Sequence, residues 1–157
     1  MKEGDGAGKG SKIEYLGELL EWVPQLIERY KIKKINDAGC GRQVWIPEDR
    51  WGVDYRGYDG HDYGNNIILD ISKRKMRKAD LIICKDVFRH MEEGAIRSAL
   101  ALFDAPLLLA DSDSGVEDHH EANTPIDMHQ FLGDPLDMVE SSEHENKYFG
   151  LWGLADA

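Results

Sequence analysis

Short apolar runs and stretches of helical spacing alternate along the chain. Five of the runs are predicted to be strands, and one of them, 79–84, is continuously apolar, as expected for a central strand buried on both faces of a parallel sheet. The five runs span residues 34–38, 52–58, 66–69, 79–84 and 106–110. Helical spacing appears before the first run, as far as Tyr30, and again over 91–103. This alternation predicts βαβ units, and therefore an α/β domain with helices on both faces of a mostly parallel sheet.

The two ends of the chain modify this pattern. Ser11 and Glu14 have the spacing of a capping box, so a helix should begin there, and Pro24 should kink it or divide it into two short helices. Residues 1–10 are polar, contain four glycines and are predicted to be mobile. The remainder, 11–157, has the length of one domain with a substantial core.

After the fifth run, the segment 111–134 is acidic and has no clear periodicity. We predict a long loop, which in a compact domain is usually functional or mobile, and a lid over the substrate is one hypothesis. Two further runs, 136–140 and 148–154, flank a polar turn and predict a hairpin. This hairpin would close one edge of the sheet with an antiparallel strand.

Composition narrows the expected partners. The formal net charge is -11, from 19 Lys and Arg against 30 Asp and Glu, which disfavours nucleic acid. Cys40 and Cys84 each end a predicted strand and are expected to be buried thiols in a reducing, cytoplasmic setting. Neither a signal peptide nor a membrane-spanning stretch is evident, so we expect no membrane partner.

The glycine turn after the first run suggests a ligand site. In Asp37-Ala38-Gly39-Cys40-Gly41, the glycines would allow a tight turn and close approach of a ligand. Asp59 ends the second run, where a carboxylate can accept both hydroxyls of a ribose, although an exposed turn is the alternative. Arg42 and Gln43 stand where a dinucleotide fingerprint continues towards a third glycine, which argues against NAD or FAD.

Further polar residues follow the third and fourth runs. Asp70 could meet an adenine amino group or simply cap a turn. Lys85, Asp86 and His90 should face the crevice at the carboxyl ends of the strands, where open α/β sheets bind ligands. Asp86, His90 and the histidines of the segment 111–134 are candidate bases, and a structural hydrogen bond is the alternative role of His90.

These motifs resemble class I S-adenosylmethionine-dependent methyltransferases. Residues 37–41 resemble the first motif of that family, residues 55–59 its ribose-binding motif and residues 79–91 its fourth-strand motif. The ending 149–154 and the opening 22–24 are similar to a small methyltransferase-like group whose chains close on Gly-Leu-Trp. Because the links between the first four strands are short, the resemblance implies a reduced Rossmann-like fold.

The resemblance also implies a role for each matching residue. The methionine part of S-adenosylmethionine would lie against Asp37, Gly39, Cys40 and Gly41. Asp59 would bind the ribose, and Asp70 and Ile71 would flank the adenine. Lys85 and Asp86 would border the methyl group and the substrate.

The sequence therefore predicts a methyltransferase acting on a small molecule or a protein side chain. No Asn/Asp-Pro-Pro-Tyr/Phe motif follows the fourth strand, which further disfavours nucleic acid. An inactive cofactor-binding or partner-binding protein of the same fold remains open, and a crevice plugged by Trp45 or by 111–134 would favour it. An enzyme that cleaves the cofactor is a third hypothesis. The acidic, histidine-containing loop is interpreted as solvated, so no metal is expected.

Overall fold

The computed structural model describes residues 17–116, 120–141 and 146–154, so the segment 1–10 and the capping box lie outside it. Seven strands form one sheet in the order β3-β2-β1-β4-β5-β7-β6. The strands β1 to β5 are parallel, and β7 runs antiparallel to both β5 and β6. The predicted α/β class with a mostly parallel sheet and a closing hairpin is confirmed. The strands are β1 (Lys34–Ala38), β2 (Asp54–Asp59), β3 (Ile67–Ile68), β4 (Leu81–Cys84), β5 (Leu107–Asp113), β6 (Asp137–Glu140) and β7 (Lys147–Gly153).

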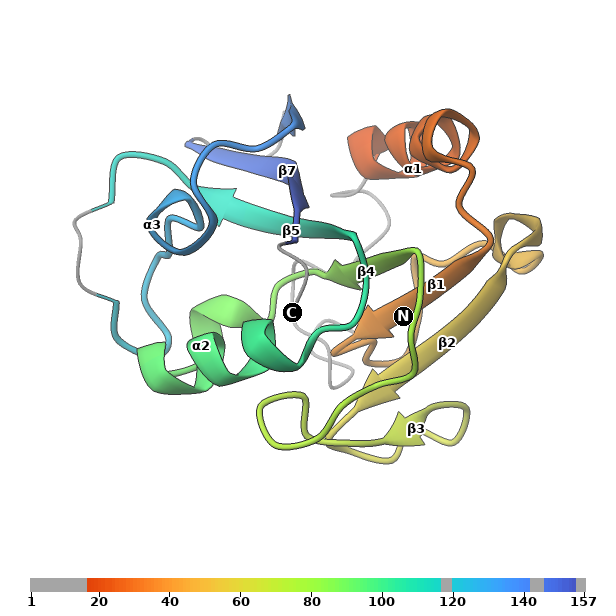
Figure 1. The fold of residues 1–157 in the computed structure, drawn as a ribbon, viewed down its shortest axis with the longest axis horizontal. Helices are drawn as coiled ribbons and strands as arrows, with labels where there is room; N and C mark the ends of the chain where they lie inside the picture. The colour runs from red at the N-terminus through yellow and green to blue at the C-terminus, as the bar shows by residue number, and fades with distance from the viewer. Residues whose placement is uncertain (1–16, 117–119, 142–145, 155–157) are drawn as a thin grey trace.

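Helices cover both faces of the sheet, as predicted (Figure 1). On one face lies α1 (Gly17–Tyr30), and on the other lie α2 (Glu93–Leu102) and α3 (His129–Leu132). The alternation of side chains along β4 divides the core between the two faces: Leu81 and Ile83 pack with α1, whereas Ile82 and Cys84 pack with α2. Because both of its faces are covered, β4 is apolar throughout.

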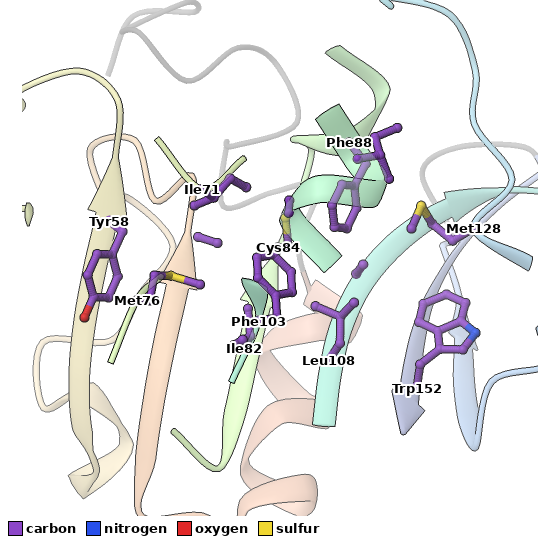
Figure 2. Close-up of a cluster of buried hydrophobic side chains, with 14 of the residues drawn as sticks. Tyr58, Ile71, Met76, Ile82, Cys84, Phe88, Phe103, Leu108, Met128 and Trp152 are labelled. Atoms are coloured by element: carbon purple, nitrogen blue, oxygen red, sulfur yellow. The ribbon is translucent and has the colours of Figure 1, made fainter. Parts of the chain in front are cut away.

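The second face is covered unevenly. From Lys31 to Glu92, a stretch that the structure describes throughout, no α-helix is present. The link from β3 to β4 instead runs over the α2 side of the sheet, and its Ile71 and Met76 are buried in the same cluster as Tyr58 (Figure 2). This half of the face is therefore covered by an extended segment, as the short links predicted.

Two predictions of secondary structure need correction. Division of the first helix at Pro24 is wrong, because a single helix, α1, continues through this exposed residue despite its missing N–H. The predicted loop 111–134 is shorter: β5 extends to Asp113, and α3 occupies 129–132. Pairing of β5 with β7 over seven residues overrides the acidic composition of this end of the strand. Among the described residues, no helix is long and apolar enough to cross a membrane.

Candidate cofactor pocket at the carboxyl ends of the strands

A cavity of about 920 Å³ lies at the carboxyl ends of β1, β2 and β4. This volume is within the range of small-molecule sites, about 300–1,000 Å³. Four separate turns and the first part of α2 supply its walls. Of the ten residues predicted from the sequence, the cavity brings together eight: Gly39, Gly41, Asp59, Asp70, Ile71, Lys85, Asp86 and His90.

The glycine turn forms one wall. Gly39 has φ +76°, and a Cβ built on it would lie 2.3 Å from Cγ2 of Val87, in the turn after β4. Gly41 also has a positive φ, +53°. Glycine is required at position 39 for two reasons: the left-handed backbone and the close approach of a neighbouring loop. The turn is held by the N–H of Gly39, which donates to the carbonyl of Tyr58 at 2.8 Å.

The carboxylate of Asp59 is fixed at the tip of β2. Its Oδ2 accepts the N–H of Gly41 at 3.0 Å, and its Oδ1 accepts the N–H of His61 at 3.0 Å. A carboxylate has about four acceptor positions, so lone pairs remain on both oxygens for hydroxyl donors. Asp59 thus joins the turn after β1, which contains Gly41, to the turn after β2, which contains His61, and this holds both turns in place before a ligand binds.

The two residues predicted to flank the adenine, Asp70 and Ile71, differ in their surroundings. Asp70 accepts the N–H and the hydroxyl of Ser72 at 3.0 and 2.7 Å, and these bonds lower the pKa of Asp70. It therefore stabilises its own turn, the alternative left open above, and also lines the cavity. Ile71 is buried beside it. Tyr63, which the sequence did not single out, also lines the cavity, with its ring 4.7 Å from that of His61.

Beyond β4, buried charges shape the floor of the cavity. Lys85 is 8% exposed; burial lowers its pKa, and the nearby carboxylates of Asp111 and Asp86 oppose that shift. Asp86 has φ +57°, a strained conformation for a residue with a Cβ. Its N–H donates to Oδ1 of Asp111 at 2.6 Å, and Oδ2 of Asp111 pairs with Nζ of Lys147 at 3.3 Å. Asp111 thus holds the turn that positions Asp86.

Sequence reasoning missed Asp111 and Lys147, and we predict a measurable role for them. Asp111→Asn should lower the free energy of unfolding by about 2 kcal/mol, because it leaves the largely buried Lys147 ammonium unpaired. The double variant Asp111→Asn/Lys147→Met should recover part of this loss. Urea denaturation of the two variants measures the difference, and equal stabilities would contradict a buried ion pair at this position.

His90 lies at the cavity with one ring nitrogen engaged. Its Nδ1 is 2.8 Å from Oδ1 of Asn123, and the N–H of Asn123 donates to the carbonyl of Arg89 at 2.6 Å. Because an amide oxygen only accepts, Nδ1 carries the proton in the neutral ring. Nε2 is then left with a lone pair, the state that a general base needs. Asn123 is a further residue that the sequence did not indicate.

Asp37 and Cys40 do not line the cavity. Asp37 is 2% exposed and accepts the hydroxyl of Tyr55 at 2.6 Å. Like Ile35, two residues earlier on β1, it lies on the α1 side of the sheet, because side chains alternate along a strand. Burial raises the pKa of Asp37 to about 6 and that of Cys40 to about 12. Both cysteines are free and buried, as predicted.

The buried carboxyl of Asp37 should make stability depend on pH. Since its folded pKa is about 6 and its ordinary value is 3.8, the folded state holds the proton longer. Stability should therefore fall by about 2–3 kcal/mol as the pH rises from 4 to 7. Asp37→Asn, which keeps an acceptor for Tyr55, should remove this loss. Urea denaturation across this range measures the loss. Asp54→Asn is the control: Arg77 lowers the pKa of Asp54, so this carboxyl is ionised in both states over most of the range, and the variant should keep the wild-type fall in stability.

Neither Trp45 nor the described part of 111–134, the two features proposed to plug the crevice, lines the cavity. Trp45 is buried in the core under α1, with its ring 5.7 Å from that of Trp51. The described residues of 111–134 are also absent from the lining. Among described residues, no three His, Cys, Asp or Glu side chains are grouped so as to hold a metal ion. Residues 117–119 of the acidic segment lie outside the described part.

Comparison with known proteins finds matches to this chain in structure but not in sequence. No family model matches the sequence, and no curated protein does so either. Solved structures do match. The methyltransferase domain of bacterial CtHen1-CN has a TM-score of 0.65 and 12% identity, covering 89% of this chain and 100% of that chain.

Two further solved structures contain a ligand. The magnesium protoporphyrin IX methyltransferase ChlM from Synechocystis PCC 6803, with bound SAH, has a TM-score of 0.63 and 15% identity over 88% of this chain and 83% of that chain. The N-methyltransferase NodS from Bradyrhizobium japonicum WM9, in complex with S-adenosyl-L-homocysteine, has a TM-score of 0.64 and 13% identity, covering 94% of this chain and 91% of that chain. The chain has the fold of class I S-adenosylmethionine-dependent methyltransferases.

Proposed function

We propose that this protein is an S-adenosylmethionine-dependent methyltransferase whose cofactor binds in the cavity at the carboxyl ends of β1, β2 and β4. One observation carries the proposal: Gly41 and Asp59 are joined by a hydrogen bond of 3.0 Å on the wall of that cavity. A glycine turn bonded to an acid of the next strand provides close backbone approach beside an acceptor for ribose hydroxyls. The solved structures of this fold with SAM or SAH bound support the same cofactor.

The residues present fit this cofactor in shape and in charge. The glycine turn would accommodate its methionine part, Asp59 would accept its ribose hydroxyls, and Ile71 would pack against its adenine. A sulfonium is cationic, and the carboxylates of Asp59, Asp70 and Asp86 all line the cavity. Asp37 would act indirectly, by holding Tyr55 and the end of β1 beneath the glycine turn.

When bound, the cofactor supplies an electrophilic methyl carbon for in-line displacement. The protein then has mainly to position an acceptor, and a base is needed only where the acceptor must lose a proton. His90 is suited to that task because its Nδ1–H is committed to Asn123 and Nε2 is left to take the proton. Asp86 would orient the acceptor from the turn fixed by Asp111. We expect the acceptor to be a small molecule or a protein side chain.

The alternative of an inactive binding protein predicts a blocked crevice. Trp45 and the described residues of 111–134 stay outside the cavity lining, which supports an enzyme. An enzyme that cleaves the cofactor, the third hypothesis, would need no acceptor, so its product would form from the cofactor alone.

Calorimetry with S-adenosylmethionine and S-adenosylhomocysteine tests the proposal directly. We expect saturable binding of both, one per chain. Incubation of a cell extract with cofactor labelled in the methyl group should then label an extract component. An absence of binding would overturn the proposal, binding without labelling would favour the inactive protein, and breakdown of the cofactor without acceptor would favour cleavage.

A further inference from the structure

Charge is distributed very unevenly along this acidic chain. Residues 31–78 contain 11 Lys and Arg against 7 Asp and Glu, whereas residues 79–157 contain 4 against 17. In the sheet, the first group forms β3, β2 and β1, and the second forms β4, β5, β7 and β6. From β2 to β7 is four strand spacings, about 19 Å, which exceeds the Debye length of about 8 Å at physiological salt. The charges of β7 and β6 are therefore largely screened from a partner bound at β3 and β2.

The basic residues gather on the segment that replaces a helix between β3 and β4. Its inward side chains, Ile71 and Met76, are buried, and its outward residues are cationic. We call this set the basic ridge: Lys73, Arg74, Lys75, Arg77 and Lys78, with Arg56 of β2 and Lys34 of β1. Arg77, Arg56 and Lys34 surround the carboxylate of Asp54 and together lower its pKa. Among the described residues, Arg56, Arg74 and Lys78 make no ion pair.

Beside the ridge, β3 is an open edge of the sheet with exposed apolar side chains. Ile67 is 42% and Ile68 60% exposed. Ile68 lines the cofactor cavity together with Arg74, and Ile67 lines a second hollow together with Arg56. An edge strand offers unpaired backbone groups to an added strand, and here an arginine lies near each of its two residues. The edge leads directly to the mouth of the cavity.

We propose that an acidic, partly apolar protein segment docks along β3 and the basic ridge and delivers a side chain to the cofactor cavity. The segment would extend the sheet by one strand, its carboxylates would meet Arg56 and Arg74, and its apolar side chains would cover Ile67 and Ile68. A long nucleic acid fits less well, because its continuous charge would run onto the acidic half of the sheet. Delivery of an acceptor rests on the proposed function, whereas docking itself does not.

Fluorescence anisotropy with two labelled probes tests the docking without cofactor. One probe is an extended peptide of about 15 residues made of Glu, Asp and Leu, and the other is a single-stranded RNA of similar charge. We expect the wild type to bind the peptide more tightly than the RNA, with an affinity that falls as salt is raised. No peptide binding, or tighter RNA binding, would overturn the proposal.

Matched charge variants locate the surface. Arg56→Glu/Arg74→Glu should weaken peptide binding at least about tenfold, because it places like charges against the probe. Arg29→Glu/Arg97→Glu makes the same change in net charge at exposed positions on α1 and α2 and should leave binding within about twofold. Equal losses in the two variants would contradict a local site. Circular dichroism confirms folding, and calorimetry of the wild type with S-adenosylmethionine separately reports failure of the proposed function.

Discussion

Gly39→Ala should lower the free energy of unfolding by about 2–5 kcal/mol and abolish binding of S-adenosylmethionine. The added Cβ meets Val87 at 2.3 Å, far inside van der Waals contact, and φ +76° is unfavourable for alanine. Relief requires the turns after β1 and β4 to separate, and both form walls of the cavity. Urea denaturation and calorimetry measure the two effects.

Gly64→Ala is the matched control for this variant. Gly64 also has a positive φ, +98°, but a Cβ there has no neighbour within 4 Å. Its loss should be about 1 kcal/mol, the part due to backbone conformation alone. If Gly39→Ala were no more destabilising than Gly64→Ala, or if it still bound the cofactor with wild-type affinity, the close packing of the two turns would not be essential.

Asp59→Asn should weaken binding of S-adenosylhomocysteine about 100- to 1,000-fold, or about 3–4 kcal/mol. In the wild type, both carboxylate oxygens accept a backbone N–H, from Gly41 and from His61. An amide has one oxygen, so its NH₂ group must oppose one of these donors. The variant therefore loses an acceptor and the negative charge, and it also disturbs the glycine turn. Calorimetry at constant pH and salt measures the change.

Asp62→Asn provides the comparison. Asp62 is a close neighbour of the same charge, is exposed, and accepts the N–H of Gly64 at 2.8 Å. It is absent from the cavity lining, so its replacement should alter affinity less than about threefold. Similar losses in the two variants would show a general effect of charge and would remove Asp59 from the site.

The sequence predicted strands well where burial alone decides the residue type. Leu81 to Cys84 are buried on both faces and read as one apolar run, so β4 was located within two residues. The end of β5 was missed because Asp111 and Asp113 are acidic. Their partners, Lys147 and the N–H of Ile126, lie 36 and 13 residues away, and no local pattern reveals such pairs.

For the site, the sequence identified the turns that form it but not the directions in which all of the side chains point. The glycine turn and Asp59 could be predicted because a tight turn needs glycine and a ribose needs an acceptor. Asp37 belongs to the same motif, but strand alternation turns it away from the cavity, as its position two residues after Ile35 already implied. Tyr63 and Asn123 carried no signal, since each lies in a link whose path only the folded chain defines.

The interior position of β7 has a consequence for synthesis of the chain. Seven residues of β5, from Leu107 to Asp113, have no partner on that side until residues 147–153 have left the ribosome. Until then, the indole of Trp152 is also missing from the core against Leu108. The strands β1 to β4 can pair before the end of the chain is synthesised. In contrast, β6 pairs with β7, which follows it in the sequence. Such long-range pairing slows folding, and it leaves the nascent β5 edge open to misassociation.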